Sequence, residues 1–107
     1  MKTLKLIAIC FLVTAYSFAN VSSTDKDALI AIYNATNGAE WNSSWDLNAS
    51  IDTWYGVKIE NENVVEINLQ FNNLDGNLPQ EIGNLTSLKV LNLGFNKLKG
   101  TLPTTLS

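Results

Sequence analysis

The feature that most constrains this chain is an internal repeat in its second half. Residues 65–79, VEINLQFNNLDGNLP, align with residues 89–103, KVLNLGFNKLKGTLP, at a fixed offset of 24 residues. Eight of the fifteen aligned positions are identical: Asn, Leu, Phe, Asn, Leu, Gly, Leu and Pro. Similarity at a fixed period of this size is typical of proteins that stack one structural unit on the next.

The repeated positions indicate what each unit looks like. Ile67 and Leu69 alternate as on a short strand and are expected to point into the core, as are their counterparts one repeat later. Asn72 and Asn96 follow where the chain leaves the strand, so an inward amide can bond backbone groups that have lost their sheet partners. Gly76 allows a tight bend. The sequence therefore predicts an α/β solenoid with a 24-residue period and a parallel sheet on its concave face.

The residues before the repeat predict one helix. Apolar or small side chains recur at i, i+3, i+4 and i+7 from Leu29, which is one face of a helix within residues 23–38. We expect Ser23 or Thr24 to cap its start and Gly38 to end it in the left-handed conformation.

Residues 39–56 have no periodicity and hold all three tryptophans among Asn, Ser and Asp. The tryptophans could form a sugar-binding platform, but we favour a small packed cluster, since most buried aromatics serve packing. Two short strands are then predicted within residues 57–69, joined by a turn near residues 61–63.

These motifs together resemble the extracellular leucine-rich-repeat proteins of the plant type. Their repeats read L-x-x-L-x-L-x-x-N-x-L-x-G-x-[IL]-P and follow an N-terminal cap, whose motif positions here are Asp25, Ala28-Leu29, Trp41, Trp45 and Trp54-Tyr55-Gly56-Val57. The plant cap usually has paired cysteines where this chain has Asp52 and Ile59. This departure, with Lys used to the exclusion of Arg, favours a bacterial relative.

The first nineteen residues differ from the rest of the chain. Two lysines precede the apolar run Leu6–Val13, and Ser17 and Ala19 stand at the −3 and −1 positions of a cut before Asn20. This is typical of a secretory signal peptide, and the run is short for a membrane span. We therefore predict three parts and a secreted or cell-surface location: signal peptide 1–19, leucine-rich-repeat cap 20–63, and repeats 64–107, of which the second is incomplete.

Composition excludes several kinds of chemistry once the signal peptide is removed. Five lysines then stand against ten acidic residues, a net charge of −5, and no Arg, His or Cys remains. A cysteine nucleophile, a histidine base and a Cys/His zinc site cannot form. The acidic charge argues against nucleic-acid binding. We expect no cofactor and no metal.

The resemblance implies binding of a protein, peptide or glycan on the concave face. The outward strand positions available for it are Glu66, Asn68, Gln70, Phe71, Val90, Asn92, Gly94 and Phe95. The repeated Phe71 and Phe95 could be binding anchors or structural residues packed against the adjoining turn; identity between repeats favours the structural interpretation. The positions that vary between repeats are better candidates for specificity.

We predict a non-catalytic binding module. An alternative is the N-terminal ectodomain of a larger receptor kinase or surface enzyme, with membrane contact only through a part not in this chain. A stand-alone hydrolase is less favoured, since its candidate carboxylates show no partner pattern: Asp46, Asp52, Glu60 and Glu62. Solenoids need about three or more repeats and capped ends, so we expect a fragment, marginally stable or self-associating, with these leucines exposed: Leu91, Leu93, Leu98 and Leu102.

Overall fold

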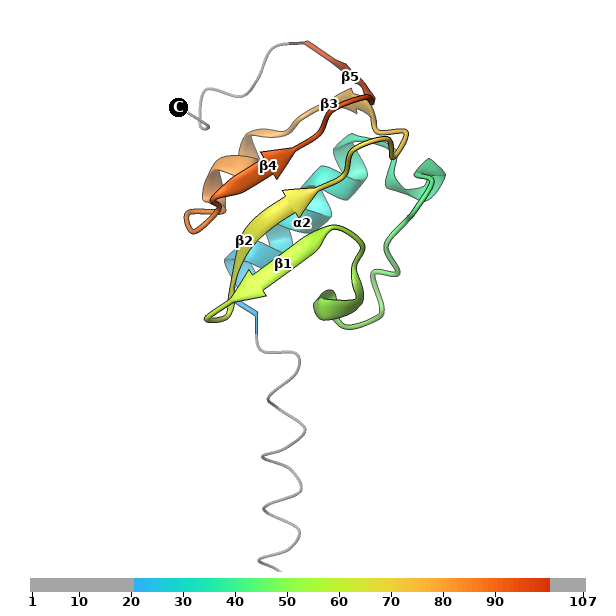
Figure 1. The fold of residues 1–107 in the computed structure, drawn as a ribbon. Coiled ribbons are helices and arrows are strands. Elements are labelled where there is room, and N and C mark those ends of the chain that lie inside the picture. The colour runs from blue at the N-terminus through green and yellow to red at the C-terminus, as the bar shows by residue number, and fades with distance from the viewer. Residues whose placement is uncertain (1–20, 101–107) are drawn as a thin grey trace, which may run out of the picture.

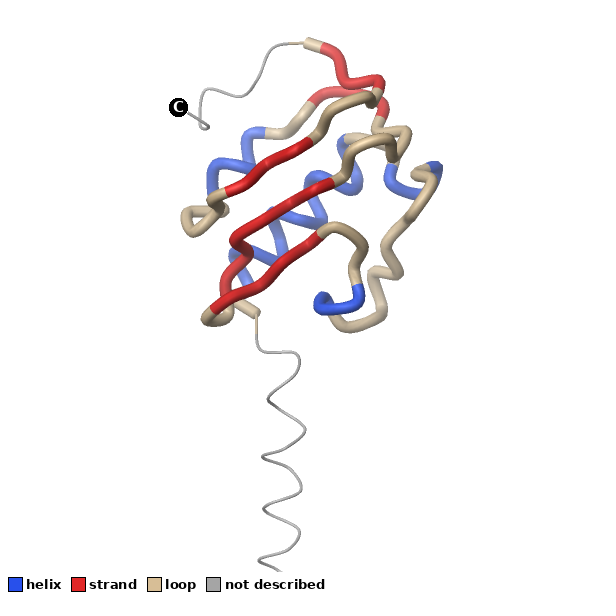
Figure 2. The backbone as a smooth tube through the Cα atoms, in the orientation of Figure 1, coloured by secondary structure: helices blue, strands red, loops and turns tan. Residues whose placement is uncertain are grey.

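The structure is a computed structural model that describes residues 21–100. Its elements, in chain order, are α2 (Ser23–Ala35), the 3-10 helices η1 (Gly38–Glu40) and η2 (Ile51–Thr53), the strands β1 (Val57–Glu60), β2 (Asn63–Asn68) and β3 (Asp75–Asn77), the 3-10 helix η3 (Gln80–Asn84), and the strands β4 (Val90–Asn92) and β5 (Lys97–Lys99). Figure 1 shows a β1–β2–β4 sheet with α2 behind it, and β3 and β5 side by side beyond one end of the sheet. Figure 2 shows the loop that leads from η1 through η2 to β1.

The strands of the repeat pair in parallel, as the sequence predicts. β2 is parallel to β4, with Ile67 opposite Leu91, and β3 is parallel to β5. The sheet as a whole is mixed, because β1 is antiparallel to β2. The expected turn between these strands consists of Asn61 and Glu62, whose φ angles of 51° and 69° reverse the chain within two residues. The prediction of a parallel sheet is therefore wrong for β1, which is antiparallel to its neighbour.

Both ends of α2 differ by a residue or more from the sequence-based expectation. The cap is Ser22, whose hydroxyl accepts a hydrogen bond from the Asp25 N–H at 3.5 Å, and not Ser23 or Thr24. The left-handed residue after the helix is Asn37, at φ 61°, and not Gly38. Asparagine tolerates this conformation, whereas Gly38 is required for space: a Cβ there would lie 2.2 Å from the Tyr33 ring.

A buried carboxylate connects the helix to the sheet. Asp25 is 3% exposed, and its Oδ2 accepts a hydrogen bond from the Val64 N–H at 2.8 Å. The Ser22 N–H donates to the Glu62 carbonyl at 2.9 Å, beside the same strand. The start of α2 is therefore fixed against the start of β2.

The core lies between the sheet and the helices behind it. Its fully buried large side chains are Leu29, Ile32, Val64, Ile67, Leu69, Leu74 and Ile82. They come from α2, β2, the turn that follows β2, and η3. The alternation predicted for Ile67 and Leu69 is confirmed, since both are completely buried.

The three tryptophans are buried, at 3–5% exposure. Each ring N–H donates to a backbone carbonyl: Trp41 to Thr36 at 3.0 Å, Trp45 to Tyr55 at 2.9 Å and Trp54 to Asp46 at 2.9 Å. The rings also contact one another, since Trp45 stacks on Trp54 at 4.9 Å and meets Trp41 edge-on at 4.8 Å. The packing interpretation of this segment is confirmed, and an exposed sugar platform of tryptophans is wrong.

The repeated asparagines bond the backbone as expected. The Asn96 amide N–H group donates to the carbonyls of Leu69 and Leu93 at 2.8 and 2.9 Å, and its oxygen accepts from the Asn72 N–H at 2.9 Å. Asn72, 1% exposed, makes the equivalent contacts with the tryptophan-rich loop before β1: its oxygen accepts from the Ser43 N–H at 2.7 Å and its amide donates to the Ser43 carbonyl. Each asparagine thus ties its own turn to the preceding segment.

The last described leucines, Leu91, Leu93 and Leu98, are half-buried, so the expectation that they are exposed is only partly met. Leu102 and the proposed signal peptide, residues 1–19, lie outside the described residues. Within residues 21–100, no helix has the length and apolarity needed to cross a membrane.

Candidate binding face

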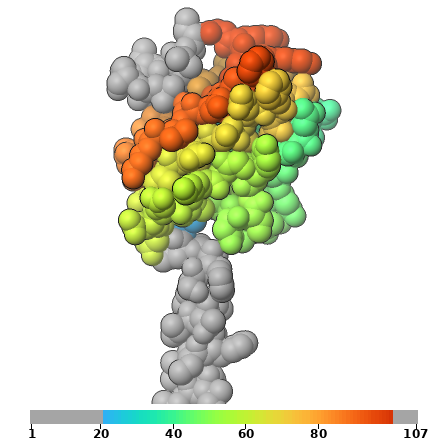
Figure 3. All heavy atoms as spheres, viewed as in Figure 1, coloured from blue at the N-terminus to red at the C-terminus, as the bar shows by residue number. Residues whose placement is uncertain are grey.

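The strand register places the predicted binding residues in two adjacent rows. Glu66 lies opposite Val90 and Asn68 opposite Asn92 across the β2–β4 pair. They alternate with the buried Ile67, so they lie on the face of the sheet that points away from the core. Figure 3 shows the β1, β2 and β4 segments at the surface on this side of the molecule. We call this surface the exposed sheet face.

Side-chain hydrogen bonds order the polar part of this face. The Asn92 amide donates to Gln70 Oε1 at 3.2 Å, and its oxygen accepts from the Gly94 N–H at 3.1 Å. Asn68 Oδ1 accepts from the Gln70 N–H at 3.4 Å. Gln70 and Asn92 therefore hold each other in place across the two repeats.

Phe71 and Phe95 stand at the end of these rows. The rings stack with centroids 4.3 Å apart and an interplanar angle of 3°, and they remain 63% and 72% exposed. The expected packing of each Phe against the adjoining turn is therefore wrong: the rings pack on each other and face solvent.

The backbone of the phenylalanine pair is unfavourable. Phe71 and Phe95 have φ angles of 55° and 57°, a region that costs an L-residue about 1–2 kcal/mol. A stacked aromatic pair contributes about 0.5–1.5 kcal/mol beyond its burial. The stacking contact thus does not offset two left-handed residues, and asparagine or glycine would fit these positions at lower cost.

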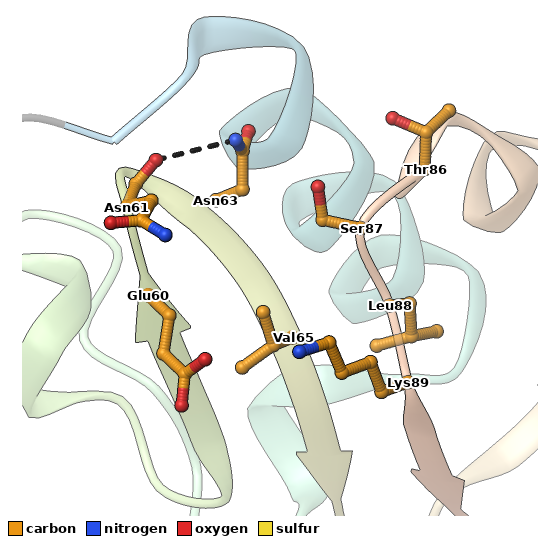
Figure 4. Close-up of a pocket in the computed structure, with 8 residues that line it drawn as sticks. All are labelled: Glu60, Asn61, Asn63, Val65, Thr86, Ser87, Leu88 and Lys89. Carbon is orange, nitrogen blue, oxygen red and sulfur yellow. Dashed lines mark hydrogen bonds between the residues drawn. The ribbon is translucent and has the colours of Figure 1, made fainter.

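Two hollows open beside the sheet. One, of about 470 Å³, is lined by Asn42, Phe71, Asn73, Phe95, Asn96 and Lys97. The other, of about 460 Å³, lies where β2 and β4 begin, and Figure 4 shows Val65 and Leu88 in it among polar side chains. Two predicted binding residues, Phe71 and Phe95, line the first hollow. None of the predicted binding residues lines the second.

Sequence reasoning missed the contribution of β1. Lys58 lies opposite Glu66 across the antiparallel pair, which places it on the exposed sheet face. Its ammonium is 3.9 Å from Glu60 Oε2, and both side chains are largely exposed. The sequence predicted the strand but not its place on this face, which follows from its pairing with β2. An antiparallel strand beside β2 extends the exposed sheet face on the side away from β4 as well.

The carboxylates considered for hydrolysis have local roles. Asp46 Oδ1 accepts from the Asn48 N–H at 2.9 Å, Asp52 accepts from the Ser50 hydroxyl, and Glu60 lies near Lys58. Among the described residues, no three Asp, Glu, His or Cys side chains group closely enough to hold a metal ion. The structure gives these carboxylates no common site.

Comparison with known proteins places the chain among leucine-rich-repeat proteins by fold. Residues 63–85 and 87–107 match the leucine-rich repeat family. A leucine-rich repeat protein from Bacteroides eggerthii DSM 20697 is similar at 36% identity with a TM-score of 0.61, over 66% of this chain and 13% of that chain. One from Bacteroides thetaiotaomicron VPI-5482 is similar at 32% identity with a TM-score of 0.61, over 66% and 10%. The PEPR1–AtPEP1 crystal structure is similar at 26% identity with a TM-score of 0.65, over 79% and 13%.

The chain therefore contains leucine-rich repeats and has a leucine-rich-repeat type of fold. Leucine-rich repeats generally form protein-binding modules. The chain spans 13% and 10% of the length of the two Bacteroides proteins.

Proposed function

We propose that this chain is a non-catalytic binding module of a secreted or cell-surface protein, and that its exposed sheet face binds a protein, peptide or glycan. The observation that carries the proposal is the register of β2 and β4, which aligns Glu66 with Val90 and Asn68 with Asn92 on one accessible surface. The ordered Asn92–Gln70 contact supports it, because a side chain held before binding loses less entropy on binding.

We further propose that this face is the concave side of a solenoid with a 24-residue period. The β2–β4 pair and the Asn72–Asn96 hydrogen bond support this, because each links a residue to its counterpart 24 residues later. Residues before the repeats then act as an N-terminal cap of the plant type. The buried Asp25 and the packed tryptophans support that role, since they cover the first turn of the core.

An extracellular location accords with the signal-like residues 1–19 and with the resemblance to extracellular leucine-rich-repeat proteins. The absence of catalysis accords with the local roles of Asp46, Asp52 and Glu60. Neither point depends on the identity of the ligand.

A selection experiment tests the binding face. Peptide display and a glycan array, probed with the full chain, would supply ligands, and their affinities would then be measured for Glu66→Ala and Asn68→Ala. We expect each change to weaken binding by roughly 0.5–2 kcal/mol, within the range of interface truncations. Glu81→Ala is the matched control, because η3 contacts α2, which lies behind the sheet in Figure 1, and Glu81 is exposed. Binding that is lost in Glu81→Ala and kept in both face variants would refute the proposal.

The second candidate function is the N-terminal ectodomain of a larger receptor kinase or surface enzyme. The small share of the Bacteroides proteins that this chain spans favours a longer protein, in which more repeats would cover Leu91, Leu93 and Leu98. The genomic sequence after codon 107 tests it. A reading frame that continues into a membrane span or catalytic domain supports the ectodomain, and a stop codon there rejects it.

A further inference from the structure

We propose that the Phe71–Phe95 pair and the hollow beside it bind an acidic saccharide, that is, a sugar ring that carries a carboxylate. This inference rests on the proposed binding function and deepens it, since it names the ligand class for one end of the exposed sheet face. The lining of the hollow carries the argument: two phenyl rings, three asparagine amides and one ammonium group.

Hydrogen bonds hold the backbone that carries the two rings, and the rings themselves stack on each other. The Phe71 N–H donates to the Gly94 carbonyl at 3.1 Å, and the Phe71 carbonyl accepts from the Asn42 amide at 3.0 Å. The Asn96 amide holds the turn that carries Phe95 through the Leu93 and Gly94 carbonyls. The protein thus keeps the backbone of two exposed phenylalanines in an unfavourable conformation. An exposed apolar ring surface of this kind suits the C–H face of a sugar ring.

The polar groups of the hollow are also oriented. The Asn42 amide donates to the Phe71 carbonyl, and the Asn73 amide donates to the Glu40 carbonyl at 3.0 Å. Each amide is therefore held by its nitrogen, which leaves its oxygen as an acceptor for a hydroxyl group. Rings beside fixed hydroxyl acceptors match a saccharide better than an apolar peptide, whose side chains would leave these amides unpaired.

The single charge in the lining selects the acidic class. Lys97 lies opposite Asp75 across the β3–β5 pair, but Asp75 Oδ1 is engaged by the Lys99 ammonium at 3.3 Å. Within residues 21–100, no ion pair involves Lys97, and no carboxylate lines the hollow. An ammonium without a partner beside oriented amides can form a charge-assisted hydrogen bond with a sugar carboxylate.

An NMR titration of the full chain tests this site. The probe is trigalacturonic acid, and a neutral galactose trisaccharide of the same length is its control. We expect the Phe71 and Phe95 ring signals to shift with the acid and far less with the neutral sugar. An equal response to both sugars, or none to the acid, overturns the proposal.

Variants separate binding from folding. Phe95→Asn removes a ring and suits the left-handed backbone, so it should keep the fold and raise the Kd for the acid at least about tenfold. Lys97→Gln should raise the Kd for the acid by a similar factor and leave weak binding of the neutral sugar unchanged. Lys26→Gln, the matched control at an exposed lysine of α2 that lines neither hollow, should bind as the parent does. Parent-like acid binding by both Phe95→Asn and Lys97→Gln contradicts the site.

The outcome also distinguishes the two proposals. If trigalacturonic acid does not bind while a selected peptide loses affinity in Glu66→Ala, the saccharide inference fails and the binding function stands. If the acid binds and depends on Phe95 and Lys97, but no selected ligand responds to Glu66→Ala or Asn68→Ala, the hollow is a site and the wider sheet face is not. If no probe binds anywhere, both proposals fail.

Discussion

The two aromatic clusters of this protein, the three tryptophans and the phenylalanine pair, differ in burial and in backbone. The tryptophans are 3–5% exposed, with every ring N–H bonded to a carbonyl. Phe71 and Phe95 are 63% and 72% exposed and have left-handed backbones. The first arrangement stabilises a fold, since it buries large apolar surfaces and satisfies their polar atoms. The second contributes little to stability, which makes it a better candidate for binding.

Trp45→Ala should cause the largest loss of stability. Trp45 contacts Trp41 and Trp54 and stacks on Tyr33 at 6.3 Å, so its removal leaves a cavity within the cluster. We expect the free energy of unfolding to fall by about 3–5 kcal/mol, measured by urea denaturation. Tyr55→Ala is the control, because that ring is 51% exposed and its backbone carbonyl, which accepts from Trp45, remains. Equal losses in both variants would mean that the tryptophan cluster is not the stabilising one.

How far the sequence predicts the fold depends on whether local residues or distant contacts decide a feature. Comparison of the two repeats predicted the parallel pairing and the roles of Asn72 and Asn96, because these follow from positions within a repeat. The helix cap was misplaced, since Ser22, Ser23 and Thr24 are equally suited by type. Ser22, the residue that caps the helix, also donates a backbone hydrogen bond to the Glu62 carbonyl. This contact joins residues that are distant in the chain.

The candidate site was predictable as a row of strand positions, but its details were not. Alternation placed Glu66 and Asn68 outward, as observed. The environment of Phe71 and Phe95 depends on the direction of two turns, which the leucine spacing does not specify. The role of Lys97 depends on whether Asp75 pairs with it or with Lys99, a choice between two side chains two residues apart.

Asn72→Ala should have an intermediate effect, and it tests the connection between the two clusters. Asn72 bonds Ser43, within the tryptophan loop, and its N–H donates to Asn96, which holds the turn of Phe95. We expect a loss of about 1–3 kcal/mol in the free energy of unfolding, because the Ser43 N–H and carbonyl lose their partner. Asn77→Ala, at an exposed position, should change it by less than about 0.5 kcal/mol. If Asn72→Ala and Asn77→Ala change the free energy of unfolding by similar amounts, Asn72 does not connect the two aromatic clusters.

Phe95→Asn should have the smallest effect on stability and thereby gives the sharpest contrast with Trp45→Ala. The change removes the stacking contact with Phe71, worth about 0.5–1.5 kcal/mol, and relieves a left-handed phenylalanine, worth a similar amount. We therefore expect the free energy of unfolding to change by less than about 1 kcal/mol in either direction, by the same urea titration. A loss near that of Trp45→Ala would show that the exposed pair stabilises the fold after all. If the free energy of unfolding does not change, the two exposed phenylalanines are not needed for stability. That result would favour ligand binding as their role.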